Sequence, residues 1–365
     1  MATQPIPSGR PVAQPIDQPK LEKFLERMLN DIGTAVRGGL CYIGDRLGLF
    51  KALAEAGPVT VEQLAGKTGL NERYLREWLG AMVTAEYVEY DVWTKQYRLP
   101  PEHALPLANE DFPYFAGGAL QMIQPLVSVA PKVAEAFRTG KGVPQSEYSP
   151  EMFESIERFT APWYKNQLVQ NWIPAMPQVE AALKAGGSAL DVGCGSGRAA
   201  IAIARAFPNA RVYGYDNHPL SIERARHNAH EADVGDRVTF DVVDCTKLPK
   251  NNFDFITTFD VVHDAVNPSG LMASIHGALT PDGTYLLLEM NCHPDLQDNV
   301  NPLGRLLYSV STLYCMTTSL AHGGEGIGAV MGEPRARDMA QHAGFRSFRR
   351  LPIEDPFSLL YELRP

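Results

Sequence analysis

The stretch Asp191–Gly197, Asp-Val-Gly-Cys-Gly-Ser-Gly, constrains the fold of this chain more than any other segment. The short apolar run Ser188–Leu190 before it predicts a buried strand, and Ala199–Phe207 after it predicts a helix. Glycines at a strand-to-helix turn let the backbone bend tightly and let a ligand approach closely. The stretch therefore predicts a parallel α/β unit with a ligand site at this turn.

The spacing of Gly193, Gly195 and Gly197 separates the possible nucleotide sites. The dinucleotide fingerprint G-x-G-x-x-G requires a glycine where this chain has Arg198. A phosphate-binding P-loop requires a Lys-Ser or Lys-Thr pair, which does not follow here. The pattern that fits is D-x-G-x-G-x-G, beginning at Asp191. A dehydrogenase with a nicotinamide cofactor is an alternative that this spacing disfavours.

Polar side chains also follow the next predicted strands. Ala210–Tyr215 leads to Asp216 and Asn217, Val238–Val243 to Asp244 and Cys245, Phe253–Phe259 to Asp260, and Gly283–Glu289 forms a fifth strand. Ligands of open parallel sheets bind beyond the carboxyl ends of the strands, so these side chains are expected along one edge. An acid at the position of Asp216 is suited to accept hydrogen bonds from both ribose hydroxyls.

The glycine motif and the strand-end acids resemble motif I and the following strands of the class I S-adenosylmethionine (SAM) methyltransferases. The resemblance implies that the glycine turn, Asp216 and Asn217 hold the ribose and the amino-acid tail of SAM. It also implies that Asp244 accepts a hydrogen bond from the adenine amino group and that the backbone of Cys245 faces the adenine ring. Asp191 and Phe259 are assigned to the same cofactor site.

His263 follows the fourth strand within Val261-Val262-His263-Asp264 and is therefore placed at the ligand edge. The sequence resembles the winged-helix small-molecule O-methyltransferases, which implies that His263 is the catalytic histidine. Ala265 stands where that family usually has tryptophan. Glu289 and Glu325 are candidates for holding the imidazole.

The atom that accepts the methyl group stays open at this point. The sequence is similar to bacterial winged-helix methyltransferases of unassigned substrate and to the S-methyltransferases of dimethylsulfoniopropionate synthesis. A hydroxyl acceptor must lose its proton, which suits a histidine base near neutral pH. A thiolate or thioether needs no base, and His263 would then orient the substrate. Tyr164, Tyr308 and Cys315 are the predicted substrate-binding residues.

Residues 57–100 have the pattern of a winged helix-turn-helix. Thr60 and Asn71 are expected to cap two helices, and Val88–Tyr90 with Gln96–Leu99 is expected to form a hairpin. This segment holds five basic and six acidic side chains. Because a DNA-reading helix presents a basic face, a dimerisation module over the active site is favoured. A SAM- or ligand-responsive transcriptional regulator is the alternative function.

The expected fold class is α/β, a Rossmann-like class I methyltransferase sheet with an N-terminal all-α, winged-helix domain. The predicted division is a disordered tail at 1–19, a winged-helix dimerisation domain at 20–110, a helical connector at 111–187 and a SAM-binding domain at 188–365. Further expected elements are a helix over 35–56, a helix over 151–183 bent near Pro162, a helix over 302–322, a lid at 323–328 and a terminal hairpin whose reversed strand lies at the sheet edge.

Composition and charge narrow the partners. The net charge of −9 argues against general affinity for nucleic acid or anionic membranes. The five cysteines are scattered without a Cys-x-x-Cys pair, which is typical of reduced thiols in a cytoplasmic protein. The sequence has neither a charged leader followed by an apolar stretch nor a long apolar run, so neither secretion nor a membrane-spanning segment is expected. His227 and His230 lack a third ligand at suitable spacing, so no metal is expected. The expected partners are a small-molecule methyl acceptor and a second copy in a homodimer.

Overall fold

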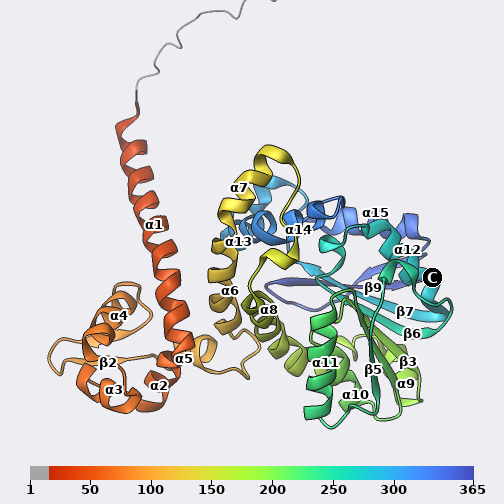
Figure 1. Ribbon diagram of the computed structural model, residues 1–365, viewed down its shortest axis with the longest axis horizontal. Coiled ribbons are helices and arrows are strands. Elements are labelled where there is room, and N and C mark those ends of the chain that lie inside the picture. Colours follow the sequence, from red (N-terminus) through yellow and green to blue (C-terminus); the bar gives the residue numbers. More distant parts are fainter. Residues whose placement is uncertain (1–15) are drawn as a thin grey trace, which may run out of the picture.

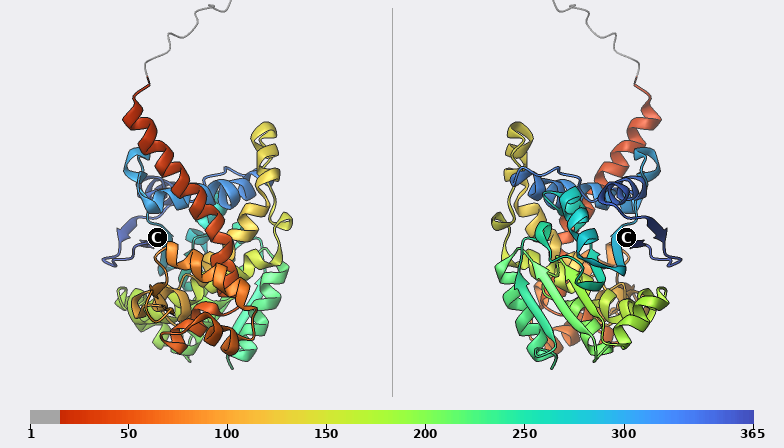
Figure 2. Two further views of the ribbon diagram at one scale, coloured as in Figure 1. Left: turned by 90° about the vertical axis from the view of Figure 1, so that its left-hand side faces the viewer. Right: turned by 90° about the vertical axis from the view of Figure 1, so that its right-hand side faces the viewer.

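The computed structural model describes residues 16–365, so most of the expected disordered tail, residues 1–15, lies outside the described residues. Figure 1 shows an N-terminal helical unit and an α/β unit, with further helices between them. The first helix, α1 (Gln18–Arg46), begins after Asp17, whose side chain accepts a hydrogen bond from the backbone of Lys20. The first part of α1 projects away from the rest of the chain (Figures 1 and 2).

The N-terminal unit has the winged-helix arrangement that the sequence predicts. After α1 come α2 (Leu49–Ala56), α3 (Val61–Thr68), α4 (Glu72–Thr84), a hairpin of β1 (Glu89–Asp91) and β2 (Gln96–Arg98), and α5 (Pro101–Ala108). Thr60 forms a capping box with Gln63, and Asn71 caps α4, as expected. The single helix predicted over 35–56 is wrong, because Gly48 has a φ of 66° and separates α1 from α2.

The connector contains α6 (Gly117–Ser128), α7 (Ala130–Thr139), η1 (Gln145–Glu147), α8 (Pro150–Trp163), the π-helical segment η2 (Tyr164–Trp172) and α9 (Pro177–Lys184). The helix predicted over 151–183 is therefore three elements. Pro162 lies inside α8, and the change to π-helical geometry follows directly after it, at Tyr164. A further break precedes Pro177, which opens α9.

A seven-stranded sheet forms the centre of the α/β unit. Its strands are β3 (Ser188–Val192), β4 (Arg211–Asp216), β5 (Val238–Val242), β6 (Phe253–Phe259), β7 (Leu279–Met290), β8 (Ser347–Arg350) and β9 (Ser358–Arg364). Their order is β5-β4-β3-β6-β7-β9-β8, and β9 runs antiparallel to both neighbours. The reversed strand was expected at the edge, which is wrong. Six of the seven residues of β9 are buried whereas β8 is largely exposed, so β8 takes the edge.

Helices cover both faces of the sheet (Figure 1). They include α10 (Arg198–Ala206), α11 (Pro219–Glu231), α12 (Pro268–Ala278) and α15 (Glu333–Ala343). Alternate residues of β7 enter two separate cores: Leu286 and Leu288 join one, and Tyr285 and Leu287 join the other. This alternation is the two-residue period of a strand covered on both sides.

The order of the strands places a switch point between β3 and β6. From β3 the chain builds outward through β4 and β5, and then returns to the opposite side with β6 and β7. Ligands of such sheets bind in the crevice that opens at this point, beyond the carboxyl ends of the strands.

The single helix predicted over 302–322 is wrong. This segment forms α13 (Pro302–Val310), the π-helical segment η6 (Ser311–Cys315) and α14 (Met316–Ala321). Between residues 16 and 365, no helix combines the length and the apolar character needed to cross a bilayer.

Candidate active site

The glycine turn has one tightly packed position and one open position. Gly193 has a φ of 69°, and a Cβ atom there would lie 2.6 Å from the side chain of Val261. Gly195 has a φ of 51°, and no heavy atom lies within 4 Å of the place its Cβ would take. Its amide donates a hydrogen bond of 2.9 Å to Oδ2 of Asp216. The turn is therefore packed against Val261 at Gly193 and leaves room for a ligand beside Gly195.

Two of the predicted cofactor-binding acids are held at the ends of β3 and β4. Asp191 is buried and accepts a 2.8 Å hydrogen bond from Oγ1 of Thr257, and burial raises its pKa to about 7. Asp216 accepts hydrogen bonds from the amides of Gly195 and His218, and burial raises its pKa. Buried carboxyl groups with raised pKa values next to an open turn are typical of a ligand site.

The residues predicted at the end of β5 are less enclosed. Asp244 is exposed, and its carboxylate accepts hydrogen bonds from Lys247 and Thr246 that lower its pKa to about 2. Cys245 is half-buried, and desolvation raises the pKa of its thiol to about 12. Asn217, after β4, is exposed. These residues stand at the expected strand ends, and Asp244 already has partners within the chain.

Aromatic side chains line the connector side of the switch point. The ring of Tyr164 lies 5.0 Å from that of Phe259, and the ring of Trp172 lies 5.9 Å from it. Burial raises the pKa of the Tyr164 hydroxyl well above its usual value, and the nearby carboxylates of Asp191 and Asp260 raise it further. Tyr164, predicted as a substrate residue, thus lies between the ends of β3 and β6.

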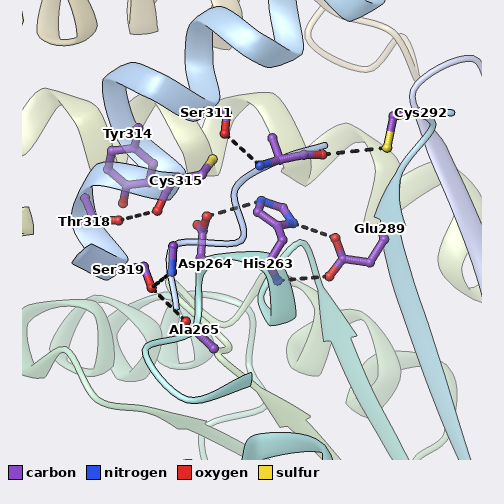
Figure 3. Close-up of polar contacts among 12 residues, drawn as sticks. His263, Asp264, Ala265, Glu289, Cys292, Ser311, Tyr314, Cys315, Thr318 and Ser319 are labelled. Carbon is purple, nitrogen blue, oxygen red and sulfur yellow. Dashed lines mark hydrogen bonds and ion pairs between the residues drawn. The ribbon is translucent and has the colours of Figure 1, made fainter. Parts of the chain in front are cut away.

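His263 lies at the centre of the second half of the site (Figure 3). It belongs to the short helix η4 (Val262–Asp264) after β6, and its side chain is 1% exposed. Nδ1 lies 2.5 Å from Oε2 of Glu289 on β7, and Nε2 lies 3.2 Å from Oδ1 of Asp264. Burial lowers the pKa of His263, but Glu289 and Asp264 raise it more, and the resulting pKa lies well above 6.5.

The structure brings one of the two candidate glutamates to the imidazole. Glu289 is buried and contacts both the backbone amide and Nδ1 of His263. Glu325 is exposed and pairs with Arg335 at 3.6 Å, so its assignment to His263 is wrong. The loop of Glu325 meets this region through its backbone instead, because the amide of Gly328 donates to the carbonyl of His263. Asp264 takes the place expected for the second glutamate.

Cys315 lies beside His263, whereas Tyr308 does not. Cys315 of η6 is buried, its Sγ lies near His263 and Asp264, and burial raises its pKa to about 12 (Figure 3). The hydroxyl of Ser319 on α14 donates a hydrogen bond to the carbonyl of Ala265, the residue that follows η4, and so connects α14 to η4. Tyr308 is 41% exposed on α13, so its predicted contact with the substrate receives no support from this arrangement.

The glycine-rich segment predicted as a lid lies against η4. The amide of Glu325 donates to the carbonyl of Val266, and the amide of Gly326 donates to Oγ of Ser319. Together with the contact from Gly328 to His263, these bonds hold the segment against η4. The lid role of this segment stays a prediction.

Two residues that the sequence places at the ligand edge have features that appear only in the structure. Asp264 faces Nε2 of His263, although its sequence position shows only that it follows the histidine. Asp260 ends β6 with a φ of 57°, and its buried Oδ1 has no hydrogen-bond partner among the described residues. A non-glycine residue in the left-handed region beside His263 is a signal of a functional role, but this signal exists only in the folded chain.

The side chains around His263 have the atoms of a cation site as well as of an acid–base site. One ligand atom each of His263, Asp264 and Cys315 lies within 4.8 Å of the others, and the same holds for Asp260, His263 and Glu289. However, both imidazole nitrogens already face carboxylates. The arrangement is therefore described most directly as a histidine between two acids.

Comparison with known proteins defines the class of this protein. Residues 183–333 match the family described as a methyltransferase domain, and residues 36–109 match the Rv2258c-like winged helix-turn-helix domain. The chain thus has a methyltransferase domain preceded by a winged-helix domain, as the glycine motif and the capped helices predict. Together with the seven-stranded sheet, these matches confirm the expected fold class.

Similar proteins agree with this class and differ in what they methylate. A sterol 24-C-methyltransferase of Eremothecium gossypii is 28% identical over 50% of this chain and 47% of its own length. The 27-O-demethylrifamycin SV methyltransferase of Amycolatopsis mediterranei is 34% identical over 29% of this chain and 39% of its own length. The chain thus spans less than half of the length of these curated relatives.

Solved structures resemble the chain over almost its whole length. An O-methyltransferase family protein of Burkholderia thailandensis has a TM-score of 0.67 at 16% identity and covers 93% of this chain and 98% of its own. Human N-acetylserotonin methyltransferase, solved in complex with SAM, has a TM-score of 0.62 at 20% identity and covers 93% of this chain and 97% of its own. At this identity the likeness establishes the shared fold.

Proposed function

We propose that this protein transfers a methyl group from SAM to an oxygen atom of a small molecule, with His263 as the base. The observation that supports the oxygen acceptor most strongly is the pairing of His263 Nδ1 with Glu289 at 2.5 Å. A carboxylate in this position orients the imidazole and stabilises the imidazolium that forms when Nε2 takes a proton. A thiolate or thioether acceptor would not require such a pair.

The residues at the switch point fit SAM. Gly195 has no side chain, and the space beside it is open to a ligand. Asp216 offers carboxylate oxygens at the end of β4, where a ribose is bound in sheets of this kind. SAM supplies a methyl group on a positively charged sulfur, which makes the methyl carbon electrophilic. The protein therefore has to hold the acceptor oxygen in line with that carbon and to remove its proton.

The two carboxylates around His263 have different roles in the proton transfer: Glu289 stays at Nδ1, and Asp264 lies at Nε2. Asp264 lies 3.2 Å from Nε2, the nitrogen that must face the acceptor hydroxyl, so the acceptor displaces Asp264 when it binds. Because Glu289 and Asp264 raise the pKa of His263, they favour the protonated imidazole, which must release its Nε2 proton to the solvent before it can act as a base. The acceptor hydroxyl then gives its proton to Nε2 while the oxygen–methyl bond forms and the sulfur–methyl bond breaks.

Calorimetric titration with SAM, S-adenosylhomocysteine (SAH) and NAD tests the cofactor without knowledge of the acceptor. We expect SAM and SAH to bind and NAD not to bind, because Arg198 replaces the third glycine of the dinucleotide fingerprint. Binding of NAD alone would contradict the proposal and favour a dehydrogenase. Once SAM binding is established, hydroxylated small molecules can be screened by the release of SAH.

We also propose that the winged-helix unit joins two copies of the chain rather than binding DNA. Four of the five basic side chains within residues 57–100 pair with acids: Lys67 with Glu55, Arg73 with Glu77, Arg76 with Glu72 and Arg98 with Glu89. The apolar side chains of Phe24, Met28, Leu29, Ile32 and Val36 on α1 are exposed, and a groove of about 720 Å³ lies between α1 and α4. Analytical ultracentrifugation should show a dimer; a monomer at micromolar concentration would refute this proposal.

A further inference from the structure

Two acids flank the switch point, and the proposed base mechanism uses neither of them. Asp191 lies at the end of β3, and Asp260 follows the end of β6. Asp191 has a hydrogen-bond partner in Thr257, whereas Oδ1 of Asp260 is buried without one among the described residues. A buried acceptor that lacks a donor is costly, so Asp260 requires a partner that the chain does not supply.

The backbone holds Asp260 next to the cofactor turn. Its φ of 57° lies in the left-handed region, and its amide donates a 3.1 Å hydrogen bond to the carbonyl of Leu288 on β7. The following residue, Val261, packs against Gly193 so closely that a Cβ at Gly193 would lie 2.6 Å from it. The carboxyl group of Asp260 is thus fixed at the crevice between the glycine turn and His263.

The neighbours of Asp260 leave it without a cation of its own. The titratable groups that face it are Tyr164 from η2, His263 and Asp264 from η4, Glu289 from β7 and Asp355 from the β8–β9 connection. Of these only His263 has positive charge, and its two nitrogens already face Glu289 and Asp264. A ligand cation with N–H donors would supply what Asp260 lacks.

We propose that Asp260 accepts a hydrogen bond from the α-ammonium group of SAM, an inference that rests on the proposed function. SAM has two positive centres, the ammonium and the sulfonium. An acceptor oxygen without a donor is satisfied by the ammonium, which has three N–H bonds, and not by the sulfonium, which has none. Asp260 therefore anchors the amino-acid tail and, through it, the position of the sulfur beside His263.

A proton is exchanged when this contact forms. Burial raises the pKa of Asp260 to about 8, so the free protein holds a proton there at neutral pH. The ammonium favours the ionised carboxylate and lowers that pKa, so binding releases the proton to the solvent. The affinity of the tail then increases as the pH rises toward 8, because less work is needed to ionise the carboxyl group.

Calorimetry with SAH and 5′-methylthioadenosine separates the tail from the rest of the ligand. Methylthioadenosine has the adenosine and the sulfur but no ammonium group. For Asp260→Asn we expect SAH to bind about 10- to 100-fold more weakly, the range for a charged hydrogen bond, and methylthioadenosine to bind as before. Asparagine tolerates the left-handed backbone, and Asp260→Gly removes any remaining strain, so both variants are expected to fold.

Asp282→Asn is the control, because Asp282 is an exposed acid in the first part of β7, away from the strand end that carries Glu289. It should leave SAH binding unchanged. With the wild-type protein, the binding enthalpy of SAH at pH 7 should change with the ionisation enthalpy of the buffer, which reports proton release. This dependence should vanish in Asp260→Asn and for methylthioadenosine.

Each other outcome overturns the inference in a distinct way. Unchanged affinity for both SAM and SAH in both Asp260 variants would show that Asp260 does not contact the ligand. Equal losses for SAH and methylthioadenosine would show a structural role. A loss confined to SAM, with SAH unaffected, would assign the residue to the sulfonium. If wild-type protein binds neither SAM nor SAH, the proposed function fails as well, whereas the other three outcomes leave it intact.

Discussion

The two halves of the site are built in different ways. The centre of the proposed cofactor half comes from one continuous stretch, the glycine turn and the acids of β3 and β4 within residues 191–216, and the turn depends largely on backbone shape. The acceptor half comes from η4, β7 and η6, which meet only in the folded chain, and it depends on side-chain charge. Binding of the donor and transfer of the methyl group should therefore be separable by mutation.

The largest expected effect is a loss of turnover without a loss of binding. His263→Ala removes the proposed base, and we expect turnover to fall by about 10²- to 10⁴-fold, the usual contribution of general base catalysis. SAH affinity should stay unchanged, because His263 contacts Glu289 and Asp264 rather than the glycine turn. His293→Ala, which removes an exposed histidine just beyond β7, is the control. Full turnover in His263→Ala would show that the histidine is structural.

The next effect concerns the cofactor half and compares two strand-end acids. Asp216→Asn should weaken SAH binding by about 10- to 100-fold. In the wild-type protein the carboxylate of Asp216 accepts a hydrogen bond from the amide of Gly195, and the substitution removes the negative charge that would face the ribose hydroxyls. Asp244→Asn should weaken it by less than about fivefold, because Asp244 is exposed and already bound to Lys247. Calorimetry on both variants measures the ratio. Equal effects would contradict the distinction between the enclosed and the exposed acid.

This contrast also describes what the sequence can predict. The glycine turn, Asp216 and the position of His263 follow from local spacing and from the rule that ligands lie beyond the strand ends. The two caps Thr60 and Asn71 are local as well, and the structure confirms them. Features of this kind need only a few neighbouring residues, so one sequence is enough to find them.

The features that the sequence leaves open or does not show depend on contacts between distant segments. The partner of His263 is Glu289 and not Glu325, because the loop of Glu325 approaches η4 through its backbone amides. The left-handed backbone and the lone carboxylate oxygen of Asp260 have no signature in its neighbours along the chain. The inner position of β9 likewise follows from its burial between β7 and β8, which composition does not show.

The smallest expected effect is a change in pH dependence within the acceptor half. Because Glu289 and Asp264 hold the pKa of His263 well above 6.5, and because the base must be neutral, kcat/KM should rise with pH and level off only above that pKa. Glu289→Gln removes one charge, while the amide oxygen still accepts the hydrogen bond from Nδ1. The pKa of His263 should then fall, and the rising limb should move to lower pH.

The same substitution distinguishes the charge of Glu289 from its geometry. The plateau of kcat/KM should also decrease, because the imidazolium formed during proton transfer loses its stabilising partner. At pH values below the wild-type limb the variant gains neutral histidine, so the two profiles approach each other as the pH falls. A lower plateau with an unmoved limb would mean that Glu289 only orients the ring. A limb that moves to higher pH would contradict the proposed electrostatics, since removal of a negative neighbour cannot favour the protonated histidine.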